Sequence, residues 1–131
     1  MHDKQCILIV DDEAFIRVLL KQTLEDLEDQ GVALLTASDG QEALEIALRH
    51  RPDLILLDVM MPYINGYDVC RQVKAVDDQI YVILLTAKGQ AIDKQEGTLA
   101  GADEYVTKPF DPDYLLMRAI EILGLHRYPE N

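Results

Sequence analysis

Short apolar segments alternate with longer amphipathic segments along the chain. The short segments lie at residues 6–10, 32–37, 54–57, 80–85 and 104–106. Most of them are rich in Ile, Leu and Val without polar alternation, which is typical of strands buried on both faces of a parallel sheet. Strands that alternate with helices predict an α/β fold in which helices cover both faces of that sheet.

The amphipathic segments have the spacing of helices that bury one side. We expect five helices, at residues 14–29, from Ser38 or Asp39 onward, and at 67–76, 90–100 and 111–123. Gly31 and Gly124 would end the first and the last helix, while Gly97 weakens the fourth. The predicted inner faces carry Ile16, Leu19, Leu20, Leu24, Leu27, Ala43, Leu44, Ala47, Leu48, Val69, Val73 and Val76.

Composition narrows the class of protein. A length of 131 residues suits one domain, and 49% hydrophobic residues are enough for a core. The formal net charge of −12 disfavours direct contact with nucleic acid or with anionic membranes. No apolar stretch approaches the roughly 18 residues of a membrane span, so we expect a cytoplasmic protein. Cys6 and Cys70 fall in predicted core segments and are expected to be buried free thiols.

Polar side chains follow the predicted strands at the point where each strand ends. Asp11 and Asp12 come after the first strand, Asp58 ends the third, Thr86 the fourth, and Lys108 follows the fifth. The carboxyl ends of parallel strands form one edge of a sheet, where α/β proteins bind their ligands. We therefore expect these five side chains to converge on one site.

The residue types indicate the chemistry of that site. Close carboxylates repel each other by about 4 kcal/mol per pair at an effective dielectric constant of 20. A hard divalent cation relieves this repulsion, and oxygen ligands suit Mg²⁺. A carboxylate beside the cation can attack a phosphoryl group and form an acyl phosphate. The cation, Lys108, and Thr86 with the backbone N–H of Ala87 could each stabilise one of the three phosphoryl oxygens.

A simpler explanation exists for each of these residues taken alone. Asp11 and Asp12 could complement the dipole of the following helix, and Asp58 could form a turn. Thr86 could cap a helix, and Lys108 could be a surface lysine. The coincidence of several polar residues at successive strand ends favours a site over these separate explanations. No histidine falls at a strand end, so a histidine metal site is not expected.

Five sequence motifs occur in an order and with a spacing that are specific to one family. They are IVDDE at 9–13, DLILLDVMMP at 53–62, NG at 65–66, LLTA at 84–87 and GADEYVTKPF at 101–110. Together they resemble the receiver domain of two-component response regulators (the CheY-like family), over residues 7 to about 123. The resemblance implies a flavodoxin-like doubly wound sheet of five parallel strands, in the order 2-1-3-4-5, with five helices.

The resemblance also implies roles for individual residues. Asp58 would be the phosphoacceptor and a ligand of Mg²⁺. Asp12 would bind the metal directly, Asp11 mainly through water, and Met60 through its backbone carbonyl oxygen. Thr86 would be the switch hydroxyl.

Two further roles concern the fifth strand. Lys108 would pair with the phosphoryl group, and the Lys108–Pro109 peptide bond would be cis. Tyr105 would be the switch aromatic, although the residues alone leave open whether it is a core residue. The phosphodonor would be a histidine kinase or a histidine phosphotransfer protein. Phosphorylation would switch the face formed by the helix at 90–100, the fifth strand and the last helix.

That face could bind a second copy of the chain or a downstream effector. Asp103, Glu104 and Arg118 fit part of the charged pattern of the family's dimer through this face. Tyr114 and Ile120 stand where charged partners are usual, which weakens the expectation of that dimer.

Two other functions are less consistent with the sequence than a phosphoaccepting receiver domain. A haloacid dehalogenase-type aspartyl phosphatase would need an acid two residues after Asp58, where Met60 stands, and a cap domain. A docking domain that works without phosphorylation would not need the complete set of site residues. We therefore expect a signalling module rather than an enzyme, with the receiver domain at 1–124 and a tail or linker at 125–131. It is either free-standing or, as we favour, the receiver end of a longer regulator.

Overall fold

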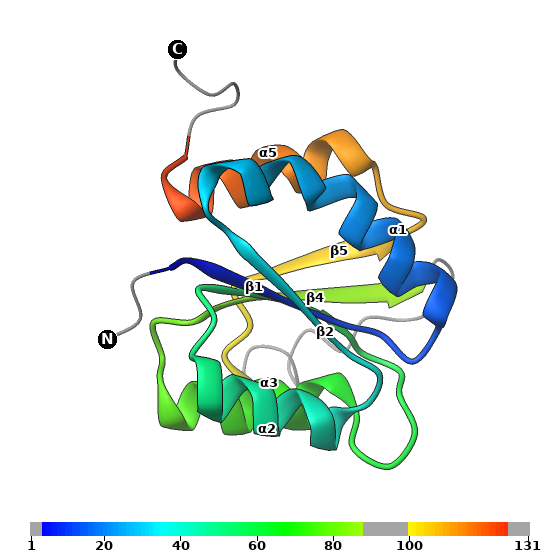
Figure 1. The fold of residues 1–131 in the computed structure, drawn as a ribbon. Coiled ribbons are helices and arrows are strands. Elements are labelled where there is room, and N and C mark those ends of the chain that lie inside the picture. Colours follow the sequence, from blue (N-terminus) through cyan, green and yellow to red (C-terminus); the bar gives the residue numbers. More distant parts are fainter. Residues whose placement is uncertain (1–3, 88–99, 126–131) are drawn as a thin grey trace.

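The computed structural model describes residues 4–87 and 100–125 of the chain. In this part of the chain, five parallel strands form one sheet in the order β2-β1-β3-β4-β5 (Figure 1). The strands are β1 (Cys6–Val10), β2 (Ala33–Ala37), β3 (Leu54–Asp58), β4 (Tyr81–Ala87) and β5 (Glu104–Lys108). The predicted fold class and strand order are confirmed.

Helices cover both faces of this sheet, as Figure 1 shows. The described helices are α1 (Ala14–Leu24), the 3₁₀-helix η1 (Glu25–Gln30), α2 (Gly40–His50), α3 (Gly66–Val76) and α5 (Pro112–Leu123). α1 and α5 lie on one face, and α2 and α3 on the other. The helix predicted at 90–100, with Gly97, lies outside the described residues except for its last position.

Strand residues alternate between two hydrophobic cores, because successive side chains of a strand point to opposite faces. Ile7, Ile9 and Leu56 pack with α1 and α5, whereas Leu8 and Leu57 belong to the core beneath α2 and α3. Each of these side chains is almost fully buried. Full burial of one such side chain stabilises the fold by about 1.5–3 kcal/mol, so the central strands contribute strongly to the stability of the fold.

The helix ends follow local capping chemistry. The side chain of Asp39 accepts a hydrogen bond from the Glu42 N–H at 2.8 Å, so Asp39 rather than Ser38 caps α2. Asn65 caps α3 by accepting from the Asp68 N–H at 3.0 Å. Gly31 and Gly124 adopt positive φ of 88° and 67° directly after η1 and α5, which confirms both predicted helix ends.

Three details of the sequence prediction are wrong. The helix predicted at 14–29 changes to 3₁₀ geometry after Leu24, within EDLEDQ, where four acidic residues meet the negative end of the helix dipole. Leu48 and Val76 were expected to face inward but are 52% and 46% exposed. Both lie in the last turn of their helix, beyond Ala47 and Val73, which make the buried contacts. The two cysteines are buried free thiols, as predicted.

Candidate functional site at the carboxyl edge of the sheet

Buried polar side chains gather where the strands end. In the described part of the chain, the buried polar residues are Asp11, Asp58 and Thr86. Strand alternation places Asp11 and Asp58 on the side of α1 and α5, because they continue the series Ile7, Ile9 and Leu54, Leu56. Polar groups without water must find partners inside the protein, so the contacts of these residues define the site.

Lys108 connects the two buried carboxylates. Its Nζ lies 2.7 Å from Asp11 Oδ2 and 3.3 Å from Asp58 Oδ1, and its side chain is only 15% exposed. These contacts join the ends of three strands that are far apart in the sequence. The predicted convergence of Asp11, Asp58 and Lys108 is therefore observed. The Lys108–Pro109 peptide bond that follows is cis.

Asp11 is held through all of its polar atoms. Its N–H donates to the Ala37 carbonyl at 3.3 Å, and its Oδ1 accepts from the Glu13 N–H at 2.9 Å. Its carbonyl oxygen accepts from Arg17 Nη1 at 2.7 Å. Because the side chain is 0% exposed, this residue has one fixed orientation. The sequence interpretation did not single out Arg17, whose contact becomes visible only once α1 packs beside the end of β1.

Acidic side chains form a cluster after β1. One carboxylate oxygen from each of Asp11, Asp12 and Glu13 lies within 4.8 Å of the others, so this group could hold a metal ion. Asp12 and Glu13 are exposed, whereas Asp11 is buried. Glu13 was not among the predicted ligands, although it belongs to the IVDDE motif. Oxygen-only donors fit a hard cation such as Mg²⁺ or Ca²⁺.

The pKa of Asp58 is raised by its burial and by the nearby charge of Asp11. This pKa rises from 3.8 to about 6, although Lys108 partly offsets the rise. Burial lowers the pKa of Lys108, but its contacts with Asp11 and Asp58 outweigh burial and raise that pKa overall. One ammonium group is thus shared between two buried carboxylates. The site has the charge to accept a further cation.

The backbone beside Asp58 approaches α3 closely. A Cβ atom on Gly66 would lie 2.4 Å from the Asp58 carbonyl oxygen, and the Gly66 N–H donates to the Val59 carbonyl at 2.8 Å. Only glycine fits this contact without displacing the backbone at Asp58. The sequence indicated a turn at Asn65–Gly66 but not this requirement. In the same loop, Met60 is 59% exposed and its N–H lies 3.4 Å from Asp58 Oδ1.

Thr86 lies at the end of β4 on the opposite side of the sheet from Asp58. It pairs in register with Thr107, as Leu84 does with Tyr105 and Ala87 with Lys108. Thr86 and Tyr105 therefore point to the same face, and Tyr105 packs, half-buried, against the core beneath α2 and α3. The Thr86 hydroxyl is buried and has no hydrogen-bond partner among the described residues. A buried hydroxyl without a hydrogen-bond partner costs free energy of folding. A new acceptor near Thr86 would therefore be bound favourably.

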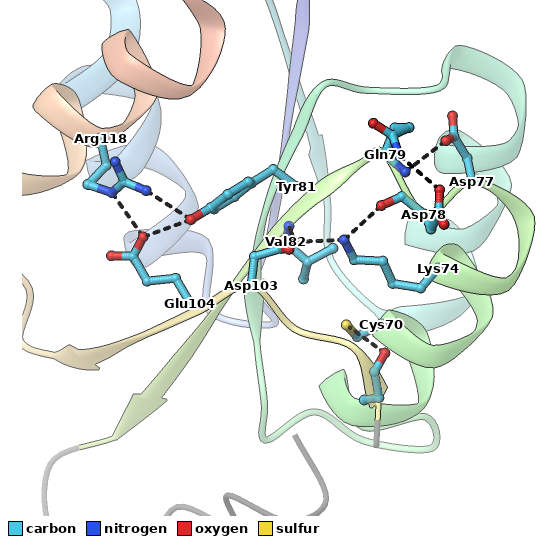
Figure 2. Close-up of polar contacts among 11 residues, drawn as sticks. Cys70, Lys74, Asp77, Asp78, Gln79, Tyr81, Val82, Asp103, Glu104 and Arg118 are labelled. Atoms are coloured by element: carbon cyan, nitrogen blue, oxygen red, sulfur yellow. Dashed lines mark hydrogen bonds and ion pairs between the residues drawn. The ribbon is translucent and has the colours of Figure 1, made fainter. Parts of the chain in front are cut away.

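A second polar cluster holds the start of β5 (Figure 2). Asp103 accepts from Lys74 Nζ at 2.7 Å and from the Val82 N–H at 2.8 Å, which ties β5 to α3 and β4. On the other face, Glu104 accepts from Arg118 Nε at 2.9 Å, and Arg118 also donates to the Tyr81 hydroxyl at 2.8 Å. The Tyr114 hydroxyl donates to Glu104 as well.

Comparison with known families decides the identity of the domain. A family model described as the response regulator receiver domain matches residues 7–120. The chain belongs to this family. It is a receiver domain of the two-component response regulators, a class of signalling rather than metabolic proteins. Neither a haloacid dehalogenase-type phosphatase nor a phosphorylation-independent docking domain is favoured by this match.

Curated relatives of the receiver domain are longer proteins. The chain is 45% identical over 117 residues to the alkaline phosphatase synthesis transcriptional regulatory protein PhoP of Bacillus subtilis, covering 89% of this chain and 48% of that protein. It is 42% identical over 123 residues to a probable transcriptional regulator, ycf27, of Guillardia theta, covering 94% and 47% respectively. The chain thus spans about half the length of these relatives.

Solved structures agree with the fold of the receiver domain. A putative response regulator from Chloroflexus aurantiacus superposes with a TM-score of 0.79 at 33% identity, covering 93% of this chain and 99% of that one. The chemotaxis protein CheY4 of Vibrio cholerae superposes with a TM-score of 0.78 at 34% identity, covering 91% and 98%. Among the described residues, no helix has the length and apolar character needed to cross a membrane.

Proposed function

We propose that Asp58 is the phosphoacceptor of this receiver domain, and that the donor is a phosphohistidine of a histidine kinase or a histidine phosphotransfer protein. The observation that carries this proposal is the contact of Lys108 with both Asp11 and Asp58 at the buried carboxyl edge of the sheet. A lysine in that position can follow the negative charge when it moves from the carboxylate to a bound phosphoryl group. We further propose that residues 1–124 form the domain and that 125–131 begin a tail or linker.

Magnesium is the metal that we propose for the site. Asp11, Asp12, Asp58 and the carbonyl oxygen of Met60 would hold it, with Asp11 acting mainly through water. The cluster after β1 and the raised pKa of Asp58 support a divalent cation, because Lys108 alone leaves negative charge in excess. Bound Mg²⁺ would neutralise the carboxylates and one phosphoryl oxygen.

We propose the following roles of the side chains in the transfer step. One Asp58 carboxylate oxygen attacks phosphorus and forms the new P–O bond, while the P–N bond to the donor imidazole breaks and its electron pair returns to that nitrogen. Lys108 exchanges its contact with Asp11 for one with a phosphoryl oxygen. Thr86 and the backbone N–H of Ala87 stabilise another oxygen. Fixed donors of this kind stabilise charge as it develops in the transition state.

The same step would act as a switch. We propose that the phosphoryl group attracts the Thr86 hydroxyl, which is buried without an acceptor among the described residues. Movement of Thr86 would free space next to Tyr105, which lies on the neighbouring strand and the same face. A ligand that binds one conformation better shifts the population toward it, and here the ligand is the covalent phosphoryl group. The proposed output face comprises the segment at 90–100, β5 and α5.

We propose two kinds of partner for that output face, namely an effector domain and a second copy of the chain. The relatives named as transcriptional regulators support a longer cytoplasmic protein, whose effector would bind nucleic acid while this acidic domain does not. A homodimer through β5 and α5 is a further possibility. In this chain, however, Glu104 and Arg118 already pair with each other, and Asp103 with Lys74, so such a dimer would have to share or exchange these contacts.

Phosphorylation by a small donor tests the proposed acceptor. Acetyl phosphate should add one phosphoryl group to the wild type, as seen in the intact mass, and only when Mg²⁺ is present. Asp58→Asn should remain unmodified, because an amide is a poor nucleophile at this step. Equal phosphate uptake by the wild type and Asp58→Asn would refute the assignment.

A further inference from the structure

Arg17 makes an unusual contact for a helix residue. It lies in the second turn of α1 and is half-buried, and its Nη1 donates to the backbone carbonyl of Asp11, six residues earlier, at 2.7 Å. The guanidinium therefore reaches back over the turn that joins β1 to α1. This turn carries the acidic cluster of Asp11, Asp12 and Glu13.

The contact fixes the plane of one peptide bond. The Asp11 carbonyl belongs to the planar unit that ends at the Cα of Asp12, so an anchored carbonyl fixes the N–Cα bond of Asp12 and limits where its side chain can lie. Asp11 itself has other anchors, namely Lys108, Glu13 and Ala37. Asp12 is exposed, and its carboxyl group interacts with that of Asp58, which is itself a proposed ligand. The position of Asp12 relative to Asp11 and Asp58 thus depends in part on the peptide that Arg17 holds.

Arg17 could affect a bound cation in two opposite ways. Its positive charge repels the cation, and removing it would strengthen binding. Its hydrogen bond orients the ligands, and removing that would weaken binding. Charge effects of partly exposed groups amount to roughly fivefold in affinity or less, whereas loss of a partner that orients a metal ligand commonly costs about 10- to 100-fold. Orientation is therefore the larger effect.

We infer that Arg17 is a positioning residue for the divalent cation, acting through the Asp11–Asp12 peptide rather than by touching the metal. This inference rests on the proposed function, because it assumes that the cation binds at the acidic cluster. It gives Arg17 a role that the charge of its side chain alone would not suggest. The sign of the change in affinity distinguishes the two effects.

Isothermal titration of the full chain with Mg²⁺ tests this role. Arg17→Met removes the charge and the hydrogen bond but keeps an unbranched apolar stem, and we expect binding to weaken by about tenfold. Arg17→Lys keeps the charge and a donor without the planar fork, so a smaller loss, of about threefold, is expected. Arg17→Lys also tests the inference by itself if Arg17→Met does not fold. Lys21→Met is the matched control, since it removes an exposed charge one turn further along α1.

The control should bind Mg²⁺ within about twofold of the wild type. Amide resonances of Asp12 and Glu13 in the metal-free protein should shift in Arg17→Met but not in Lys21→Met, which gives a readout independent of affinity. Binding by Arg17→Met that equals or exceeds wild-type binding would overturn the inference and leave the proposed function intact. A wild type that binds no Mg²⁺, or an Asp12→Ala variant that binds normally, would instead overturn the proposed metal site and this inference with it.

Discussion

The two edges of the sheet use the same residue types in different ways. At the amino edge, Asp53 accepts from the Cys6 N–H at 2.8 Å, Asp103 pairs with Lys74, and Glu104 pairs with Arg118. Each of these carboxylates has its own donor. At the carboxyl edge, the buried Asp11 and Asp58 share Lys108. In the first arrangement Asp103 and Glu104 each have a cation of their own, whereas the second leaves negative charge in excess.

This difference separates structural from functional ion pairs. Balanced contacts such as those in Figure 2 join α3, β4, β5 and α5, and they need no ligand. At the other edge, burial and the charge of Asp11 raise the pKa of Asp58 to about 6, because the shared Lys108 offsets them only in part. Ionisable groups with strongly shifted pKa values occur most often at functional sites. The comparison therefore predicts that a cation acts at one edge only.

Magnesium binding should give the largest contrast between the edges. Mg²⁺ at 100 times its Kd should stabilise the native protein by about 2.7 kcal/mol, because the ligand binds only the folded state. Asp12→Ala should abolish the rise in melting temperature with Mg²⁺. Asp103→Asn, the control at the amino edge, should lower the melting temperature but keep the response. If millimolar Mg²⁺ does not change the wild-type melting temperature, the carboxyl edge does not bind a cation as proposed.

The pH dependence of the metal-free protein should show the excess charge directly. The folded pKa of Asp58, about 6, exceeds its value of about 3.9 in an unfolded chain, so the native state binds the proton more tightly. Stability should therefore fall as pH rises from about 4 to 6 and then level off. We expect a loss of about 2 kcal/mol after allowance for screening by solvent.

Asp58→Asn isolates this contribution. The variant should lack this segment of the pH profile and be more stable than the metal-free wild type at pH 7, as measured by urea unfolding. Identical profiles for the two proteins between pH 4 and 7 would show that the charge of Asp58 is already compensated.

Disruption of the balanced cluster should lower stability without touching the metal site. Glu104→Gln leaves Arg118 with a neutral acceptor, and we expect a loss of about 1 kcal/mol in the free energy of unfolding. Glu121→Gln is the control, because Glu121 is exposed and lies 3.7 Å from the same arginine. Titration calorimetry should give the wild-type Kd for Mg²⁺ in both variants. A marked change in that Kd would mean that the two edges are coupled.

The lifetime of the phosphorylated state should depend on Met60. In this family the residue two positions after the acceptor flanks the path of the attacking water, and Met60 is apolar and cannot orient that water. We expect slow hydrolysis and a severalfold acceleration in Met60→Asn, because a positioned nucleophile reacts faster. A phosphate-release time course at saturating Mg²⁺ measures both. A wild-type half-life of seconds, or a mutant no faster than its parent, would contradict this expectation.

In this family the residue two positions after the switch threonine, here Lys88, also flanks the path of the attacking water. Its side chain could stabilise the phosphoryl oxygens or be an ordinary solvated lysine. It lies outside the described residues, so the expectation remains a prediction from the sequence.

Local patterns in the sequence predicted most of the architecture. Apolar runs that end at Asp11, Asp58, Thr86 and Lys108 were sufficient for the strands. They also predicted the convergence that is observed for Asp11, Asp58 and Lys108, because parallel strands end together. The choice between Ser38 and Asp39 as cap needed the observed hydrogen bond. Such patterns depend on residues that are close in sequence.

Tertiary contacts account for what could not be predicted. Arg17 and Gly66 were missed because their partners, the carbonyls of Asp11 and Asp58, are backbone groups that no residue type reveals. Leu48 and Val76 have the right spacing for a core, but the turns that carry them extend past the buried contacts. The change from α1 to η1, in contrast, falls in the acidic segment EDLEDQ, a local signal that the helical spacing of apolar residues outweighed in the prediction.

Chemical mapping of the phosphoryl group tests the central claim most directly. Hydride reduction converts an acyl phosphate of aspartate to homoserine, which peptide mass spectrometry locates at a single position. After treatment with acetyl phosphate and Mg²⁺, the wild type should contain homoserine at position 58, and a sample prepared without Mg²⁺ should contain none. Homoserine at Asp11, Asp12 or any other aspartate, with Asp58 unmodified, would contradict the account.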